Sequence, residues 1–193
     1  MRATTLLQNQ HREVEALFEA LETATREDRL ETGMKLATAL AGHMVIEEEL
    51  FYPAAMKDQK DRVLGNQEEH ELAASTLKRL LEEPTDEATC AARARVLRRM
   101  LEEHIQEEEE QLFPTFESMT GDEELEALGE KMEQRFQEVT KAGPEAALAM
   151  RPSAKAGQAP MPGGQQQPGQ QQPGQQQPGR QQQPGQRGRG RTR

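Results

Sequence analysis

Apolar residues recur at helical spacing through the first 150 residues of the chain. In the opening stretch Leu7, Val14, Leu17, Phe18 and Leu21 share one helical face. Capping residues and helix breakers divide the remainder and predict five helices, over residues 5–24, 27–58, 61–82, 86–117 and about 120–143. Because the connections between them are short, the first four predict an all-α, antiparallel up-down-up-down four-helix bundle with an additional C-terminal helix.

Two prolines fall inside the second and fourth predicted helices, at Pro53 and Pro114. Proline lacks a backbone N–H, and its ring clashes with the carbonyl four residues earlier. We therefore expect each helix to kink or end there, just beyond the histidine and glutamate motif described below.

The composition changes near residue 150. QQQPG recurs at 165–169, 170–174, 175–179 and 181–185, and Arg-Gly alternation follows. This stretch has almost no apolar side chains to bury, so it cannot offset the entropy of ordering. We predict a helical domain over residues 1–145 and a disordered Gln/Pro/Gly-rich tail over residues 146–193.

Charge and cysteine content restrict the class of protein. The net charge is −10, yet the residues after Glu145 include seven basic and no acidic ones. We interpret the acidic body as a solubility feature, and we favour an inert or solubilising tail over one that contacts nucleic acid through Arg-Gly. A single cysteine, Cys90, and no signal peptide or apolar membrane span predict a cytoplasmic protein without membrane association.

An internal repeat includes every histidine in the sequence. The stretch HMVIEEELFYP at 43–53 returns as HIQEEEEQLFP at 104–114, and each copy is preceded by a lone histidine. Each half therefore supplies one lone histidine and one His-x-x-x-Glu motif. The residues concerned are His11, His43, Glu47, His70, His104 and Glu108.

Helical geometry turns these six side chains toward the apolar face. At about 100° per residue, His43 and Glu47 lie about 40° apart, on the side that also carries Leu36 and Leu40. The same geometry rotates the adjacent acidic residues toward solvent and places Tyr52 on the opposite side, about 180° from His43. The solvated acidic residues are Glu48, Glu49, Glu109 and Glu110.

Buried carboxylates need compensation, because an unpaired buried charge costs several kcal/mol. A lone histidine on an apolar face is usually an ordinary core residue, but six polar groups in a symmetric pattern favour metal ligands. Imidazole and carboxylate suit iron, manganese or zinc. Two equivalent ligand sets predict two ions, with bridging glutamates, two histidines each and open positions, where iron would react with dioxygen, peroxide or nitric oxide.

The pattern H…HxxxE…H…HxxxE resembles the hemerythrin-like proteins, or HHE cation-binding domains, over about residues 1–142. The resemblance implies a four-helix bundle with a non-heme di-iron centre, its two iron ions oxo- or hydroxo-bridged and held by the six residues above. Members carry oxygen, sense oxygen or redox state, respond to iron, or handle peroxide or nitric oxide.

Two departures from the oxygen-carrying members shift this expectation. Those proteins have a further histidine where this chain has Ala74, and an aspartate where it has Glu108. The loss of one ligand predicts two nearly equivalent irons, each with an opening, which favours redox chemistry or sensing over reversible carriage. Asn66 and Gln67, one turn before His70, are candidates for the missing ligand.

Three functions remain open from the sequence. The first is a di-iron protein that engages dioxygen, peroxide or nitric oxide for sensing, oxidative protection, or storage of iron or oxygen. The second is a catalase-like or ferroxidase enzyme. The third is a helical scaffold whose basic tail mediates an interaction. The sequence leaves the oligomeric state undecided.

Overall fold

The computed structural model describes residues 1–25, 27–82 and 86–152. This part is helical and contains no strand, which confirms the all-α class. None of its helices is long and apolar enough to cross a membrane. The predicted tail beyond residue 152 lies outside the described residues.

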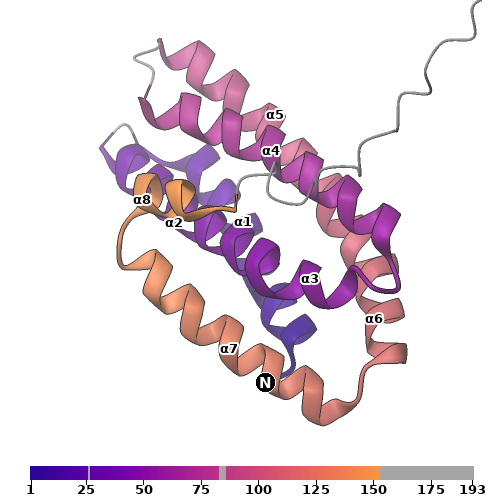
Figure 1. The fold of residues 1–193 in the computed structure, drawn as a ribbon. Helices are drawn as coiled ribbons and strands as arrows, with labels where there is room; N and C mark the ends of the chain where they lie inside the picture. Colours follow the sequence, from indigo (N-terminus) through magenta and orange to yellow (C-terminus); the bar gives the residue numbers. More distant parts are fainter. Residues whose placement is uncertain (26, 83–85, 153–193) are drawn as a thin grey trace, which may run out of the picture. The chain divides into compact units, whose positions relative to one another are not determined.

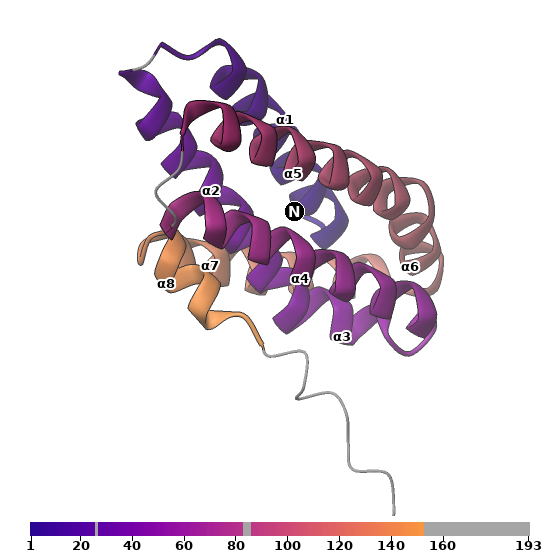
Figure 2. The ribbon, with the colours of Figure 1, turned by 90° about the horizontal axis from the view of Figure 1, so that it is seen from above.

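Two helical hairpins form the body of the molecule (Figures 1 and 2). In chain order the elements are α1 (Ala3–Thr23), α2 (Asp28–Ile46), the π-helical turn η1 (Glu47–Phe51), α3 (Tyr52–Ala55), α4 (Lys60–Glu82), α5 (Glu87–Glu107), the π-helical turn η2 (Glu108–Leu112), α6 (Phe113–Met119), α7 (Asp122–Thr140) and α8 (Pro144–Met150). Helix α1 packs along α2 and α4 packs along α5, while α7 lies against both α1 and α2. The up-down-up-down order of α1, α2, α4 and α5 stays a prediction.

The C-terminal helices differ from the single fifth helix that we predicted. Gly143 has φ 83°, a left-handed conformation that suits glycine, and it separates α7 from α8. Helix α8 then packs against α2 and α4, with Ala147 fully buried. Residues 146–150, which we predicted as part of the disordered tail, are therefore helical, because Ala147 and its neighbours find an apolar surface to pack on. The division of the chain into a domain and a tail stays a prediction.

The two helices depart from α-helical geometry earlier in the sequence than we predicted, ahead of Pro53 and Pro114. Each helix widens into a π-helical turn that begins at the motif glutamate, where the amide of Tyr52 donates to the carbonyl of Glu47 and that of Phe113 to Glu108. A wider turn moves the backbone away from the ring of the following proline, and the chain stays helical through α3 and α6. The departure from α-helix thus starts within the motif, and not beyond it.

A polar layer separates two apolar clusters in the core. Along α1, Leu7 belongs to one cluster and Val14 to the other, and the buried His11 lies between them. The same apolar, polar, apolar order occurs along α2–α3, α4 and α5–α6. The motif residues of all four helices therefore meet at one level of the bundle, enclosed on both sides by hydrocarbon.

Gly129 marks a close approach between α7 and the start of the chain. A Cβ atom here would lie 2.1 Å from the carbonyl oxygen of Met1 and 2.9 Å from the amide nitrogen of Ala3. Because backbone must move to relieve this overlap, Gly129→Ala is expected to lower the free energy of unfolding by about 1–3 kcal/mol.

Gly65 provides the matched control, since nothing lies within 4 Å of a Cβ added at that position in α4. Gly65→Ala should raise the free energy of unfolding by about 0.5–1 kcal/mol, because alanine loses less entropy in a helix. Urea unfolding of both variants measures the difference. An equal response at the two sites would contradict the packing of the N-terminus on α7.

Candidate metal centre

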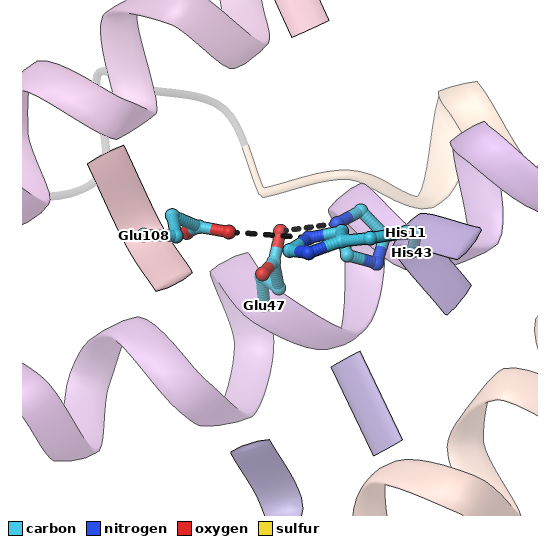
Figure 3. A group of neighbouring side chains, drawn as sticks. All are labelled: His11, His43, Glu47 and Glu108. Atoms are coloured by element: carbon cyan, nitrogen blue, oxygen red, sulfur yellow. Dashed lines mark ion pairs between the residues drawn. The ribbon is translucent and has the colours of Figure 1, made fainter. Parts of the chain in front are cut away.

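The six predicted residues come together in the polar layer, and all six are buried. They come from four places in the fold: His11 from α1, His43 and Glu47 from α2–η1, His70 from α4, and His104 and Glu108 from α5–η2. Figure 3 shows the side chains of four of these residues pointing toward one another. The sequence repeat therefore selects side chains that meet in space.

The six residues form two groups that share Glu47. The first contains His11, His43, Glu47 and Glu108, and the second contains Glu47, His70 and His104; within each group the candidate ligand atoms lie within 4.8 Å of one another. Oε2 of Glu47 lies 3.0 Å from Nε2 of His43 and 3.3 Å from Nε2 of His70. The carboxylate of Glu47 thus stands between the two groups.

Several of the converging atoms lack a hydrogen-bond partner. They are Nε2 of His11, both carboxylate oxygens of Glu47 and Oε2 of Glu108, all of them buried. Glu47 and Glu108 are each 0% exposed. Buried carboxylate oxygens without a partner are strongly unfavourable, so this arrangement fits cations bound between the side chains. The residues present are suitable ligands for a metal of the iron, manganese or zinc type.

Outer contacts orient every histidine with Nε2 toward the centre. Each Nδ1 lies within hydrogen-bond distance of one acceptor: His11 with Glu109 at 2.9 Å, His43 with Gln10 at 3.0 Å, His70 with Glu48 at 3.0 Å and His104 with Glu69 at 2.7 Å. When Nδ1–H donates to these oxygens, the lone pair of Nε2 faces inward, as metal ligation requires.

The outer contacts follow the internal repeat. The residue before each lone histidine, Gln10 or Glu69, bonds the motif histidine of its own hairpin. The residue after each motif glutamate, Glu48 or Glu109, bonds the lone histidine of the other hairpin. Aligning the two halves could have revealed these pairs, because they occupy matching positions.

The predicted solvent exposure of the acidic runs is wrong in part. Glu48 is buried against His70, and Glu109 contacts His11 and Arg12. Only Glu110 of the four is exposed. The physical reason is that the π-helical turns widen the backbone at these positions, so uniform rotation of 100° per residue no longer applies.

Tyr52 also lies in the centre, contrary to the prediction that it packs elsewhere. Its hydroxyl donates to Oε1 of Glu108 at 2.9 Å and lies 3.2 Å from Nε2 of His70. Asn66 donates to the same Glu108 oxygen at 3.1 Å. The extra residue in η1 rotates everything after it by about 100°, which turns Tyr52 from the outer face toward the ligands.

Electrostatics in the cluster favour charged histidine next to charged carboxylate when no metal is bound. Burial opposes protonation of His11, but its contacts with Glu108 and Glu109 outweigh burial and raise its pKa to about 9. Burial likewise opposes protonation of His70, whose contacts with Glu47 and Glu48 raise its pKa to about 9. Burial dominates at His43 and lowers its pKa.

The carboxylate and the phenol respond as expected from the same charges. Burial would raise the pKa of Glu47, but His43 and His70 hold it well below its ordinary value. Burial, together with Glu108, raises the pKa of Tyr52 well above 10. In the metal-free protein, protonated His11 and His70 therefore supply positive charge next to the buried carboxylates.

Metal loading is expected to release protons at neutral pH. His11 and His70 are protonated at pH 7 because their pKa values are about 9, and each must become neutral to ligate a metal. A weakly buffered metal-free sample should release about two protons per chain when saturated, and its apparent affinity should rise between pH 6.5 and pH 9.

The free energy of unfolding of the metal-free protein should fall as pH rises, whereas its metal affinity should rise. A raised folded-state pKa stabilises the fold fully below pH 6.5, and this contribution is lost as pH rises through about 9.

Calorimetric titration of the metal-free protein with metal, in buffers of different ionisation enthalpy, counts the protons released on metal binding. Binding without proton release at pH 7 would contradict the assignment of these histidines.

The helical fold and its buried histidine and glutamate cluster define a bundle built around a cation-binding site. The chain belongs to the hemerythrin HHE cation-binding domain family, whose family model matches residues 2–116. Helices α7 and α8 lie beyond this match. A search of curated protein sequences gives no significant match.

A crystal structure supports the same assignment. The chain is similar to a hemerythrin HHE cation-binding domain-containing protein from Mycobacterium kansasii, with 27% sequence identity and a TM-score of 0.68. The similarity covers 78% of this chain and 99% of that protein. It therefore extends over the whole length of the mycobacterial chain.

Proposed function

We propose that this protein binds two iron ions between the α1–α2 and α4–α5 hairpins, with Glu47 shared between the ions. The observation that carries this proposal is the carboxylate of Glu47, fully buried, with neither oxygen hydrogen-bonded and with histidines of two groups at 3.0 and 3.3 Å. The proposed ligands are His11, His43, Glu47 and Glu108 for one ion and Glu47, His70 and His104 for the other.

Iron suits this donor set better than softer metals. The ligands are imidazole and carboxylate groups, and the single cysteine, Cys90, belongs to neither group. Two histidines and one carboxylate form the second set, a combination that leaves coordination positions open in non-heme iron proteins. A bound pair of iron ions supplies redox chemistry toward dioxygen, peroxide or nitric oxide.

The protein side chains protect and orient such a centre. The two apolar clusters exclude bulk water above and below the polar layer, and the ring of Phe113 stacks on that of His11 at a centroid distance of 5.8 Å. Tyr52 and Asn66 both donate to Oε1 of Glu108, which leaves Oε2 for a metal. Glu69 is about half exposed and bonds His104, so it connects the layer with solvent.

We infer that the centre engages dioxygen, peroxide or nitric oxide, in sensing, oxidative protection or storage. The open positions of the second ligand set and the family membership support this function. The scaffold alternative depends on the basic tail, of which residues 153–193 lie outside the described part of the chain.

Metal analysis with optical spectroscopy tests the proposal. Protein expressed with iron and purified in air should contain about two irons per chain and absorb in the near ultraviolet. The spectrum should change on adding peroxide, or nitric oxide after reduction. Sustained oxygen release from peroxide would assign catalase-like turnover, whereas protein without bound metal would refute the proposal.

A further inference from the structure

Arg151, which directly follows α8, reaches into the outer contacts of the candidate metal centre. Its Nε lies 3.0 Å and its Nη2 2.6 Å from Oε1 of Glu48, and Nη2 also lies 3.1 Å from Oε1 of Glu71. The side chains of Arg151 and Glu48 are only 8% and 5% exposed. Arginine and carboxylate thus form a buried pair with two donors on one acceptor group.

The same Glu48 carboxylate holds His70. Its Oε1 lies 3.0 Å from Nδ1 of His70, and Nε2 of that histidine lies 3.3 Å from Oε2 of Glu47. A guanidinium with two donors fixes the orientation of a carboxylate more firmly than a single hydrogen bond. Without Arg151, Glu48 would be a buried charge whose remaining strong partner is the histidine itself, at a substantial energetic cost.

Arg151 comes from a part of the chain that the family match does not include. The match ends at residue 116 and contains all six proposed ligands, whereas Arg151 is carried by the segment after α8. Pro144 and Ala147 of α8 are buried, and α8 packs against α2 and α4. The packing of α8 therefore determines where the guanidinium lies.

We infer that Arg151 is a positioning residue that couples the docked C-terminal helix α8 to metal binding at the His70 and His104 position. The inference rests on the proposed di-iron function. It concerns one ion only, because the outer partners of His11 and His43 are Glu109 and Gln10, and within the described residues neither of them is hydrogen-bonded to Arg151. Loss of Arg151 should loosen one ion and spare the other.

Arg135 of α7 provides an internal control. It bonds Glu49, the neighbour of Glu48, at 2.7 and 3.0 Å, so it is also a C-terminal arginine paired with a carboxylate of η1. In the described part of the chain, however, the histidine Nδ1 atoms are bonded by other residues, and Glu49 is not among them. Removing Arg135 deletes a two-donor pair to the neighbouring glutamate, with side chains 30% and 25% exposed, without altering the support of a proposed ligand.

The first test compares iron release from full-length Arg151→Gln, Arg135→Gln and the unmodified protein. With a ferrous chelator under reducing conditions, Arg151→Gln should lose one of its two irons about 10–100-fold faster, the range typical of an outer-contact substitution. Arg135→Gln should release iron like the unmodified protein. Equal release from the two variants would overturn the inference.

The second test uses hydrogen exchange and needs no iron release. Coupling between two sites is reciprocal, so metal loading should slow amide exchange in residues 145–150 of the unmodified protein. Arg151→Gln should abolish this difference, and Arg151→Lys, which keeps the charge, should retain part of it. Equal amide exchange in α8 of the metal-loaded and metal-free unmodified protein would overturn the inference, even if Arg151→Gln folds poorly.

The outcomes separate this inference from the function on which it rests. If the unmodified protein binds no metal, the di-iron proposal itself fails. If it binds two irons but Arg151→Gln and Arg135→Gln release them alike, only the role of Arg151 fails.

Discussion

Replacing Glu47 by glutamine is expected to remove both metal ions at once. Glu47 belongs to both ligand groups, and its two oxygens are buried without hydrogen-bond partners. Glutamine has nearly the same shape but one carbonyl oxygen and no charge, so it cannot neutralise or bridge two cations. Iron content should fall from about two per chain to nearly zero, measured by elemental analysis after expression with iron.

Two substitutions along the second motif provide the comparison. Glu108 is a proposed ligand of the first group, and its Oε2 also lies 3.6 Å from Nε2 of His104, whereas Glu47 belongs to both groups; Glu108→Gln should therefore retain more iron than Glu47→Gln, about one per chain. Glu110 is exposed and bonds Gln106 of its own helix, so Glu110→Gln should retain about two. A Glu47→Gln protein with one firmly bound iron would show that the two positions are independent and that Glu47 is not shared.

Removing the metal should lower thermal stability substantially. A ligand present at about 1,000 times its dissociation constant stabilises the folded state by about 4 kcal/mol. A chain of this size shifts its melting temperature by about 2–4 °C per kcal/mol, so metal removal should lower it by about 10 °C. The physical reason is that Glu47 then depends on the neighbouring histidines for compensation, and Glu108 on His11 together with the Tyr52 and Asn66 donors.

Scanning calorimetry of the loaded and metal-free protein measures this shift. The control is Glu47→Gln, which should melt at the same temperature with and without added iron. Identical melting temperatures for the loaded and metal-free unmodified protein would mean that metal does not hold the polar layer together.

Much of the candidate centre could be predicted from the sequence because its four histidines lie on regular α-helix and its two glutamates are the first residues after one. His43 and Glu47 are one turn apart, and the α-helical geometry that places them on the apolar face holds up to Glu47. The repeat then predicted the matching residues in the second hairpin, and the family match confirmed the resemblance. Helical spacing and repetition were sufficient for this part of the site.

The residues that the sequence did not reveal lie where the helix departs from regular geometry. Glu48 lies in a π-helical turn and Tyr52 directly follows it. A uniform rotation per residue cannot predict the direction of side chains at such a turn. Arg151 enters from a distant segment that the repeat does not include. Its position depends on how α8 packs, which is a property of the tertiary structure.

The repeat also overstates the equivalence of the two positions. At matching places, His43 is bonded by the neutral amide of Gln10 and His104 by the carboxylate of Glu69. A carboxylate partner makes an imidazole a stronger electron donor than an amide does. We therefore expect the two ions to differ electronically, unlike the nearly equivalent pair that the ligand pattern predicted.

Anomalous X-ray diffraction at the iron absorption edge, on crystals of the iron-loaded protein, tests the central claim most directly. We predict two anomalous peaks about 3.5–4 Å apart in the polar layer. One should lie among His11, His43 and Glu108, the other beside His70 and His104, with the carboxylate of Glu47 bound to both. A single peak, or two peaks that Glu47 does not join, would contradict a two-metal centre shared through this residue.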